Sequence, residues 1–105
     1  MTYRLYQIKD IENVTYAFRQ YNPNIFKYSD YECVYEGEIE CEDKTNPEIC
    51  EELYYLFNMR HPKGFEGRSM SMSDVIELTI NKRPLFYYCN ICGFQRLPQP
   101  AQKNR

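Results

Sequence analysis

The most regular pattern of apolar and polar positions lies at residues 31–41, where uncharged side chains alternate with glutamates. This period of two predicts a β-strand with one buried face and one acidic, solvated face. The buried face would carry Tyr31, Cys33, Tyr35 and Ile39. Val34 breaks the alternation, and Gly37 is a candidate position for a β-bulge.

Four shorter segments also predict strands. Residues 2–8 contain no breaker and place apolar side chains on both faces, which is typical of a strand inside a sheet. Residues 75–80 and 85–89 are separated by a turn and would pair as a hairpin. Residues 94–97 follow Gly93 as a short final strand.

Two segments predict helices. Residues 47–60 place Ile49, Leu53 and Phe57 on one helical face, after Asn46 as the capping residue and Pro47 at the first helical position. Residues 11–20 follow Asp10 as an N-cap, and their apolar positions roughly fit a second helical face. The sequence therefore predicts a single α+β domain with a four- to five-stranded mixed or antiparallel sheet and two helices on one face. The domain would span residues 1–97, and residues 98–105 would form a flexible C-terminal tail.

Length, charge and cysteine content narrow the setting of this domain. With 105 residues and a net charge of −2, the chain fits one domain and is not basic enough overall to attract nucleic acid by charge. Residues 30–52 carry ten acids and one base, which is either a solvated face or a surface for a basic partner. No apolar run reaches the roughly 18 residues that span a bilayer, and the charged residues among positions 1–20 leave no apolar signal-peptide core there. We therefore expect a cytoplasmic protein without a membrane partner, in which the five cysteines form no disulfide framework.

Cys89 and Cys92 have the spacing of half a zinc site, because two thiolates two residues apart can bind one Zn²⁺ on a tight turn. Tetrahedral zinc needs two further ligands, and no second Cys-x-x-Cys is present. Two small buried cysteines beside a turn explain the pair more simply, so no metal or other cofactor is predicted.

Residues 67–74 form the segment that most resembles a binding site. Its polar groups are clustered on a connection longer than a plain turn requires, and the predicted hairpin would bring two further side chains close to it. The predicted partner-binding residues are Arg68, Ser69, Ser71, Ser73, Asp74, Tyr88 and Asn90. In the simpler interpretation, Ser73 and Asp74 fix a turn while Met70 and Met72 fill the core.

The pair Tyr87 and Tyr88 suggests a further alternative, since aromatic rings on a sheet can stack on single-stranded bases. Lys82 and Arg83 are the nearest basic residues, but no basic lining is interleaved with the rings. A nucleic-acid partner is therefore not the preferred prediction.

Several segments together resemble the YodL-like domain family of Firmicutes and their mobile elements. The resemblance covers about residues 1–97 and rests on the segments YRLYQIKD (3–10), VYEGEIE (34–40), LYYLFN (53–58), RSMSMSDVIEL (68–78) and YYCNICGF (87–94). Cys92 departs from the serine usual in the family, so the resemblance does not imply zinc. It implies a small regulatory or accessory module and carries over no catalytic residues.

The sequence thus predicts a small cytoplasmic regulatory or accessory protein that acts by protein–protein interaction and is not an enzyme. Its protein partner and its oligomeric state are not predicted. The alternatives are a zinc-binding module using Cys89 and Cys92 and a single-stranded nucleic-acid binder.

Overall fold

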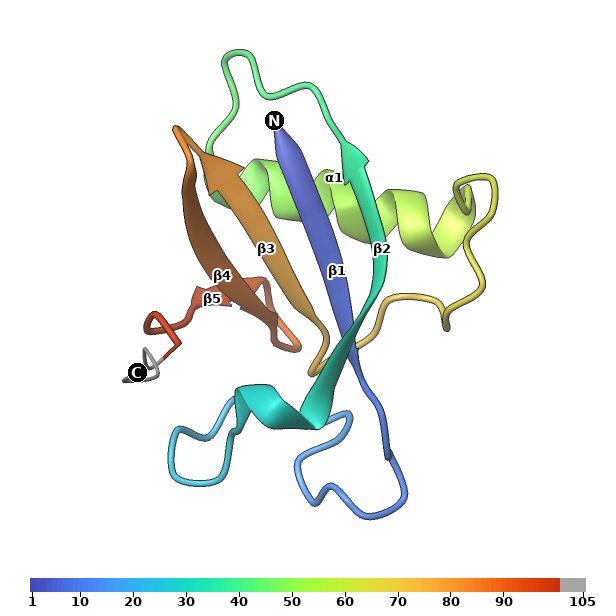
Figure 1. Ribbon diagram of the computed structural model, residues 1–105, viewed down its shortest axis with the longest axis vertical. Helices are drawn as coiled ribbons and strands as arrows, with labels where there is room; N and C mark the ends of the chain where they lie inside the picture. Colours follow the sequence, from blue (N-terminus) through green and yellow to red (C-terminus); the bar gives the residue numbers. More distant parts are fainter. Residues whose placement is uncertain (101–105) are drawn as a thin grey trace, which may run out of the picture.

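The computed structural model describes residues 1–100, whose strands form a single antiparallel sheet. The strands are β1 (Thr2–Ile8), β2 (Tyr31–Glu38), β3 (Val75–Ile80), β4 (Arg83–Cys89) and β5 (Phe94–Arg96). Their order across the sheet is β2-β1-β3-β4-β5 (Figure 1). β1 pairs with β2 on one side and β3 on the other, which confirms the interior position predicted from its two apolar faces.

One α-helix, α1 (Asn46–Met59), covers one face of the sheet (Figure 1). Its buried side chains pack against the β1, β3 and β4 residues that point towards it. The helix begins at Asn46, one residue earlier than predicted. Its N-cap is Thr45 and not Asn46. The Glu48 amide donates to Thr45 Oγ1 at 3.3 Å, and the Thr45 amide donates to Glu48 Oε1 at 2.8 Å, forming a capping box.

The predicted helix at residues 11–20 is wrong, since this segment forms turns. Its apolar residues at positions 14, 16 and 18 are two apart and do not share a helical face. Its local amide bonds form turns, and the Phe18 amide donates to the distant Ser73 Oγ at 3.0 Å. Just beyond the segment, the Tyr21 amide donates to Asn90 Oδ1 at 2.9 Å. Phe18 also has a φ of 63°, which a right-handed helix excludes.

Residues 9–30 instead form an irregular cover without an α-helix, which ends in a short 3₁₀ helix (Tyr28–Asp30) that leads into β2. Figure 1 shows this cover at one end of the sheet. Its aromatic and apolar side chains pack with sheet residues that face away from α1. The prediction of two helices on one face is therefore corrected to one helix on one face and an irregular segment against the other.

A β-bulge in β2 reverses the predicted facing of its first residues. Leu5 pairs with Tyr35 and Tyr6 pairs with Cys33, so Val34 is an extra residue on β2. Because cross-strand partners share a face, Tyr35 lies on the α1 side, whereas Cys33 and the preceding Tyr31 lie on the opposite side. The prediction of one buried face for this strand was therefore wrong, and the break in alternation at Val34 is the position of the bulge.

Gly37 is not at the bulge, but it does permit a close approach. A Cβ atom at this position would lie 2.9 Å from the Tyr3 hydroxyl oxygen. The strand itself ends at Glu38 and not at residue 41.

The C-terminal half follows the prediction closely. β3 and β4 pair as an antiparallel hairpin, although β4 begins at Arg83 and not at residue 85. β5 ends at Arg96, one residue before the predicted end. Beyond it, Gln99 Nε2 donates to the Pro84 carbonyl at 2.7 Å, and Tyr28 donates its hydroxyl proton to the Pro98 carbonyl. The first part of the predicted tail thus contacts the domain, and residues 101–105 lie outside the described residues.

Candidate functional site

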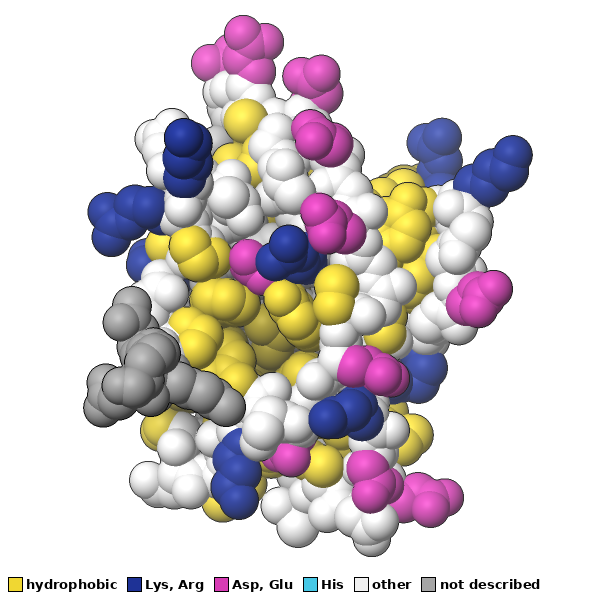
Figure 2. All heavy atoms as spheres, in the orientation of Figure 1, with side chains coloured by type: hydrophobic (Ala, Val, Ile, Leu, Met, Phe, Trp, Pro, Cys, Tyr) yellow, Lys and Arg dark blue, Asp and Glu magenta, His cyan; other side chains and the backbone are white. Residues whose placement is uncertain are grey.

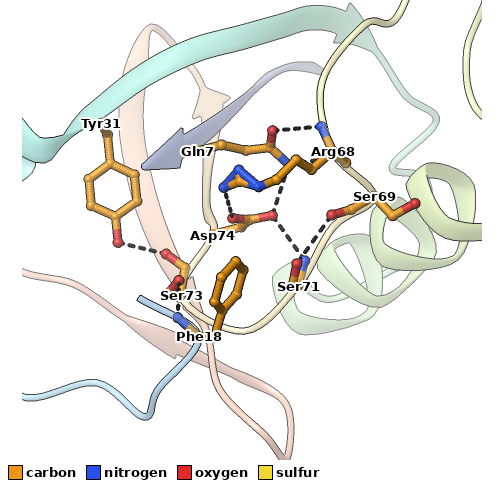
Figure 3. Close-up of polar contacts among 8 residues, drawn as sticks. All are labelled: Gln7, Phe18, Tyr31, Arg68, Ser69, Ser71, Ser73 and Asp74. Atoms are coloured by element: carbon orange, nitrogen blue, oxygen red, sulfur yellow. Dashed lines mark hydrogen bonds and ion pairs between the residues drawn. The ribbon is translucent and has the colours of Figure 1, made fainter. Parts of the chain in front are cut away.

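Asp74 is the centre of the polar cluster that the sequence singled out, and it is fully buried immediately before β3 (Figure 3). Its Oδ2 accepts hydrogen bonds from the Ser71 amide at 2.9 Å and from Gln7 Nε2 at 3.1 Å. Its Oδ1 lies 3.8 Å from Arg68 Nη2. Among the described residues, Asp74 Oδ1 and Arg68 Nε are the two buried side-chain atoms without a hydrogen-bond partner. The ion pair is therefore loose, while the carboxylate is held firmly through its other oxygen.

Gln7 attaches the loop before β3 to the interior strand β1. Its Nε2 donates to the Arg68 carbonyl at 2.8 Å, and its Oε1 accepts from the Arg68 amide at 3.1 Å. The side-chain amide thus pairs with the backbone much as another strand would. Gln7 is itself buried, so this pairing removes its polar atoms from water with partners in place.

Ser73 connects three separate parts of the fold. Its Oγ accepts from the Phe18 amide, and its carbonyl accepts from the Tyr31 hydroxyl at 2.6 Å. Its amide donates to the Cys89 carbonyl at 2.9 Å. The residue is buried and has a φ of 83°, a conformation that these bonds hold in place.

The other predicted binding residues are also engaged within the fold. The Arg68 guanidinium lies 5.7 Å from the centre of the Phe18 ring, a cation–π distance. Ser69 is exposed, with its Oγ 3.2 Å from His61 Nε2. Tyr88 is buried and donates its hydroxyl proton to the Arg19 carbonyl at 2.8 Å. Asn90 accepts from the Tyr21 amide and donates to Gln95 Oε1.

The seven predicted residues therefore do not form one exposed edge. Ser73, Asp74 and Tyr88 are buried and act within the fold. Ser71 and Asn90 instead line a hollow of about 290 Å³ between α1 and the β4–β5 turn. The other residues of this α1–turn hollow are Glu51, Tyr54, Met72, Cys89, Ile91, Gly93 and Phe94.

Sequence reasoning missed the apolar members of the α1–turn hollow. Ile91 is 71% exposed and Tyr54 is 39% exposed, although both are large and apolar or aromatic. The sequence does contain one signal of this exposure, because Ile91 is a large apolar residue between polar and small residues in the Asn90–Gly93 turn. Tyr54 lies one position after Leu53 of the core face of the helix, and this position alone does not predict an exposed binding residue.

The pKa of Asp74 predicts a pH dependence of stability. Burial raises this pKa to about 7, although the Ser71 amide, Gln7 and Arg68 each lower it. In the unfolded chain an aspartate titrates near about 3.9, so between these two values the folded state binds the proton more tightly. The contribution of Asp74 to stability is therefore fully present below about pH 4 and falls as the pH rises towards 7.

Urea unfolding of the wild type and of Asp74→Asn between pH 4 and pH 8 measures this effect. The free energy of unfolding of the wild type, relative to the non-titrating variant, is expected to fall up to about pH 7 and then stay level. A difference that stays constant from pH 4 upwards would show that Asp74 keeps an ordinary pKa.

The two cysteines of the candidate zinc half-site differ in environment. Cys89 is buried and Cys92 is exposed. Burial raises the pKa of Cys89 to about 12, which disfavours the thiolate that zinc requires. Within residues 1–100, no three side chains of His, Cys, Asp or Glu are placed to hold a metal ion together.

The tyrosine pair considered for base stacking does not offer its rings to solvent. Tyr87 faces α1 and accepts a hydrogen bond from Asn46 Nδ2 at 3.0 Å. Tyr88 faces the opposite side beneath the 9–30 cover. Both rings are buried, so neither is available to stack on a base. Lys82 and Arg83 are exposed at the β3–β4 turn.

These features define a small α+β domain in which one helix covers a five-stranded antiparallel sheet. The model of the YodL-like domain family matches residues 2–99, and the chain belongs to this family. Comparison with curated proteins and with solved structures found no match. In the part of the chain that the structure describes, no helix combines the length and apolar character needed to cross a membrane.

Proposed function

We propose that this protein is a small cytoplasmic regulatory or accessory module that acts by binding another protein and not by catalysis. The observation that carries this proposal is the α1–turn hollow, flanked by the exposed side chains of Ile91 and Tyr54. Exposed large apolar side chains beside a concave surface are typical of the centre of a protein interface.

The chemistry of the α1–turn hollow indicates the kind of partner. Met72 and Phe94 are half-buried in it and offer apolar contact, while Ser71 and Asn90 supply polar groups. Glu51 is its charged member and belongs to the acidic segment of residues 30–52. This combination suits a protein segment that inserts an apolar side chain and places a basic residue opposite Glu51.

The cluster around Asp74 supports a non-catalytic role. Ser73 and Asp74 are occupied by hydrogen bonds that join the loop to β1, β2 and β4. The simpler interpretation of this segment, as a structural turn, accounts for these contacts. The partner-binding role of Ser71 and Asn90 is retained in the proposal because both line the α1–turn hollow.

Ile91→Asp tests the proposal, since it places a charge on the exposed apolar wall. The matched control is Met59→Asp, which changes a side chain of similar exposure near the end of α1. Wild type and both variants would be immobilised and exposed to extract of the native host, and the retained proteins identified by mass spectrometry. Any protein lost only with Ile91→Asp would then be purified and its Kd measured.

We expect Ile91→Asp to weaken binding at least about tenfold, and Met59→Asp to leave it unchanged. Circular dichroism of both variants checks that the fold is intact. A partner that binds wild type and Ile91→Asp equally would show that the α1–turn hollow is not the interface. Absence of any selectively retained protein would also count against the proposal.

A further inference from the structure

The face of the sheet opposite α1 carries a second hollow, separate from the α1–turn hollow. Figure 2 looks onto this face and shows apolar side chains gathered in a depression near its centre. The depression has a volume of about 210 Å³. Its lining residues are Tyr6, Tyr28, Tyr31, Val75, Phe86 and Pro100, and we refer to it as the aromatic hollow.

The walls of the aromatic hollow are mainly rings. The Phe86 and Tyr28 ring centres are 5.4 Å apart, with the ring planes at 68°, so the two rings pack edge to face. The Tyr6 and Phe86 ring centres are 6.4 Å apart, with the ring planes at 48°. Val75 is buried and pairs with Tyr6 across the sheet, so it lies between these walls as part of the floor. The lining thus contains three phenol rings and one phenyl ring, and the face of each ring is its electron-rich part.

The charges beside the aromatic hollow favour a cation. Glu77 pairs with Phe86 across β3 and β4 and therefore points to the same face. Its Oε1 accepts the Tyr6 hydroxyl proton at 2.7 Å, and its Oε2 lies 3.5 Å from Arg4 Nη1. The same Arg4 also pairs with Glu36, at 3.1 Å from Nε to Oε1. Two carboxylates thus share one guanidinium, which leaves this group with a net negative charge.

We infer that the aromatic hollow binds a small quaternary ammonium compound. Such a group is both bulky and cationic, and it gains from apolar contact and from the ring faces at once. The size agrees, because about 210 Å³ is below the roughly 300–1,000 Å³ of pockets that hold drug-sized ligands. A small quaternary ammonium group such as that of choline fits this space, whereas a nucleotide does not.

The experiment compares choline with 3,3-dimethyl-1-butanol, which has the same shape but carbon in place of the charged nitrogen. Each compound is titrated into the ¹⁵N-labelled protein at constant ionic strength, and the amide shifts of Val75 and Phe86 are followed. Choline is expected to shift both signals in a saturable way, with the neutral compound binding about tenfold more weakly. Equal binding of the two compounds, or saturable binding of neither, would overturn the inference.

Substitutions at Tyr28 test whether the ring is the binding element. Tyr28→Leu is expected to weaken choline binding about tenfold. Tyr28→Phe retains the ring and loses only the hydroxyl bond to the Pro98 carbonyl, so its affinity is expected to stay close to that of the wild type. Tyr55→Leu on the exposed surface of α1 is the control, and it is expected to change nothing. If Tyr28→Leu fails to fold, Tyr6→Leu replaces it. Unchanged choline affinity in a folded ring-removing variant would refute the proposed site.

Discussion

Replacing Phe57 with alanine is expected to lower the free energy of unfolding by about 3–5 kcal/mol. Phe57 is fully buried on the face of α1 that meets the sheet. Its ring centre lies 4.9 Å from that of Phe65, 5.5 Å from that of Tyr35 and 6.1 Å from that of Tyr3. These rings come from β1, β2 and the loop after the helix, so no single rearrangement can refill the space that alanine leaves.

Urea unfolding followed by circular dichroism measures this loss. Tyr55→Ala on the same helix is the matched control, because its side chain is largely exposed. Its expected effect is within about 0.5 kcal/mol. Similar losses in the two variants would mean that α1 does not pack through the Phe57 face.

Asp74→Ala is expected to cost about 2–4 kcal/mol, even though the removed side chain is small. The substitution leaves the Ser71 amide and Gln7 Nε2 without their shared acceptor. It also leaves the Arg68 guanidinium without its nearest carboxylate. Unmatched buried donors are expensive because they lose water without gaining a partner.

Asp74→Asn separates the loss of the acceptor from the loss of charge. The amide oxygen can still accept from both donors, so at neutral pH this variant is expected to retain most of the stability. Both variants would be compared with wild type by urea unfolding at pH 7. A cost below about 1 kcal/mol for Asp74→Ala would show that the hydrogen bonds at Asp74 do not hold the loop in place.

The strands and α1 were predictable because their signals are local. The Pro47 start, the Leu53 and Phe57 spacing and the turn between residues 80 and 83 each require only neighbouring residues. The facing of β2 was not predictable in the same way, because one inserted residue at Val34 changes which side chains point to α1. The break in alternation was visible, but its meaning depended on the register with β1.

The missed segment at residues 11–20 shows a different limit. Its turn at Phe18 depends on an acceptor at Ser73, 55 residues further along the chain, and its end depends on Asn90. No pattern among neighbouring residues predicts hydrogen bonds to partners so distant in the sequence. The segment of residues 68–74 resembled an exposed binding site for the same reason. Its polar groups form hydrogen bonds with β1, β4 and the 9–30 cover, and these partners are distant in the sequence.

The interior position of β1, between β2 and β3, also determines how the chain can assemble. β4 lies next to β3 through a tight turn, so their hairpin closes with little loss of chain entropy. β1 has no such neighbour, because Ile8 pairs with Tyr31 and Leu5 pairs with Ile76, far along the sequence. Folding therefore requires β1 to close two long chain loops, one to β2 and one to β3, and substitutions in β1 are expected to slow folding where its contacts form in the transition state.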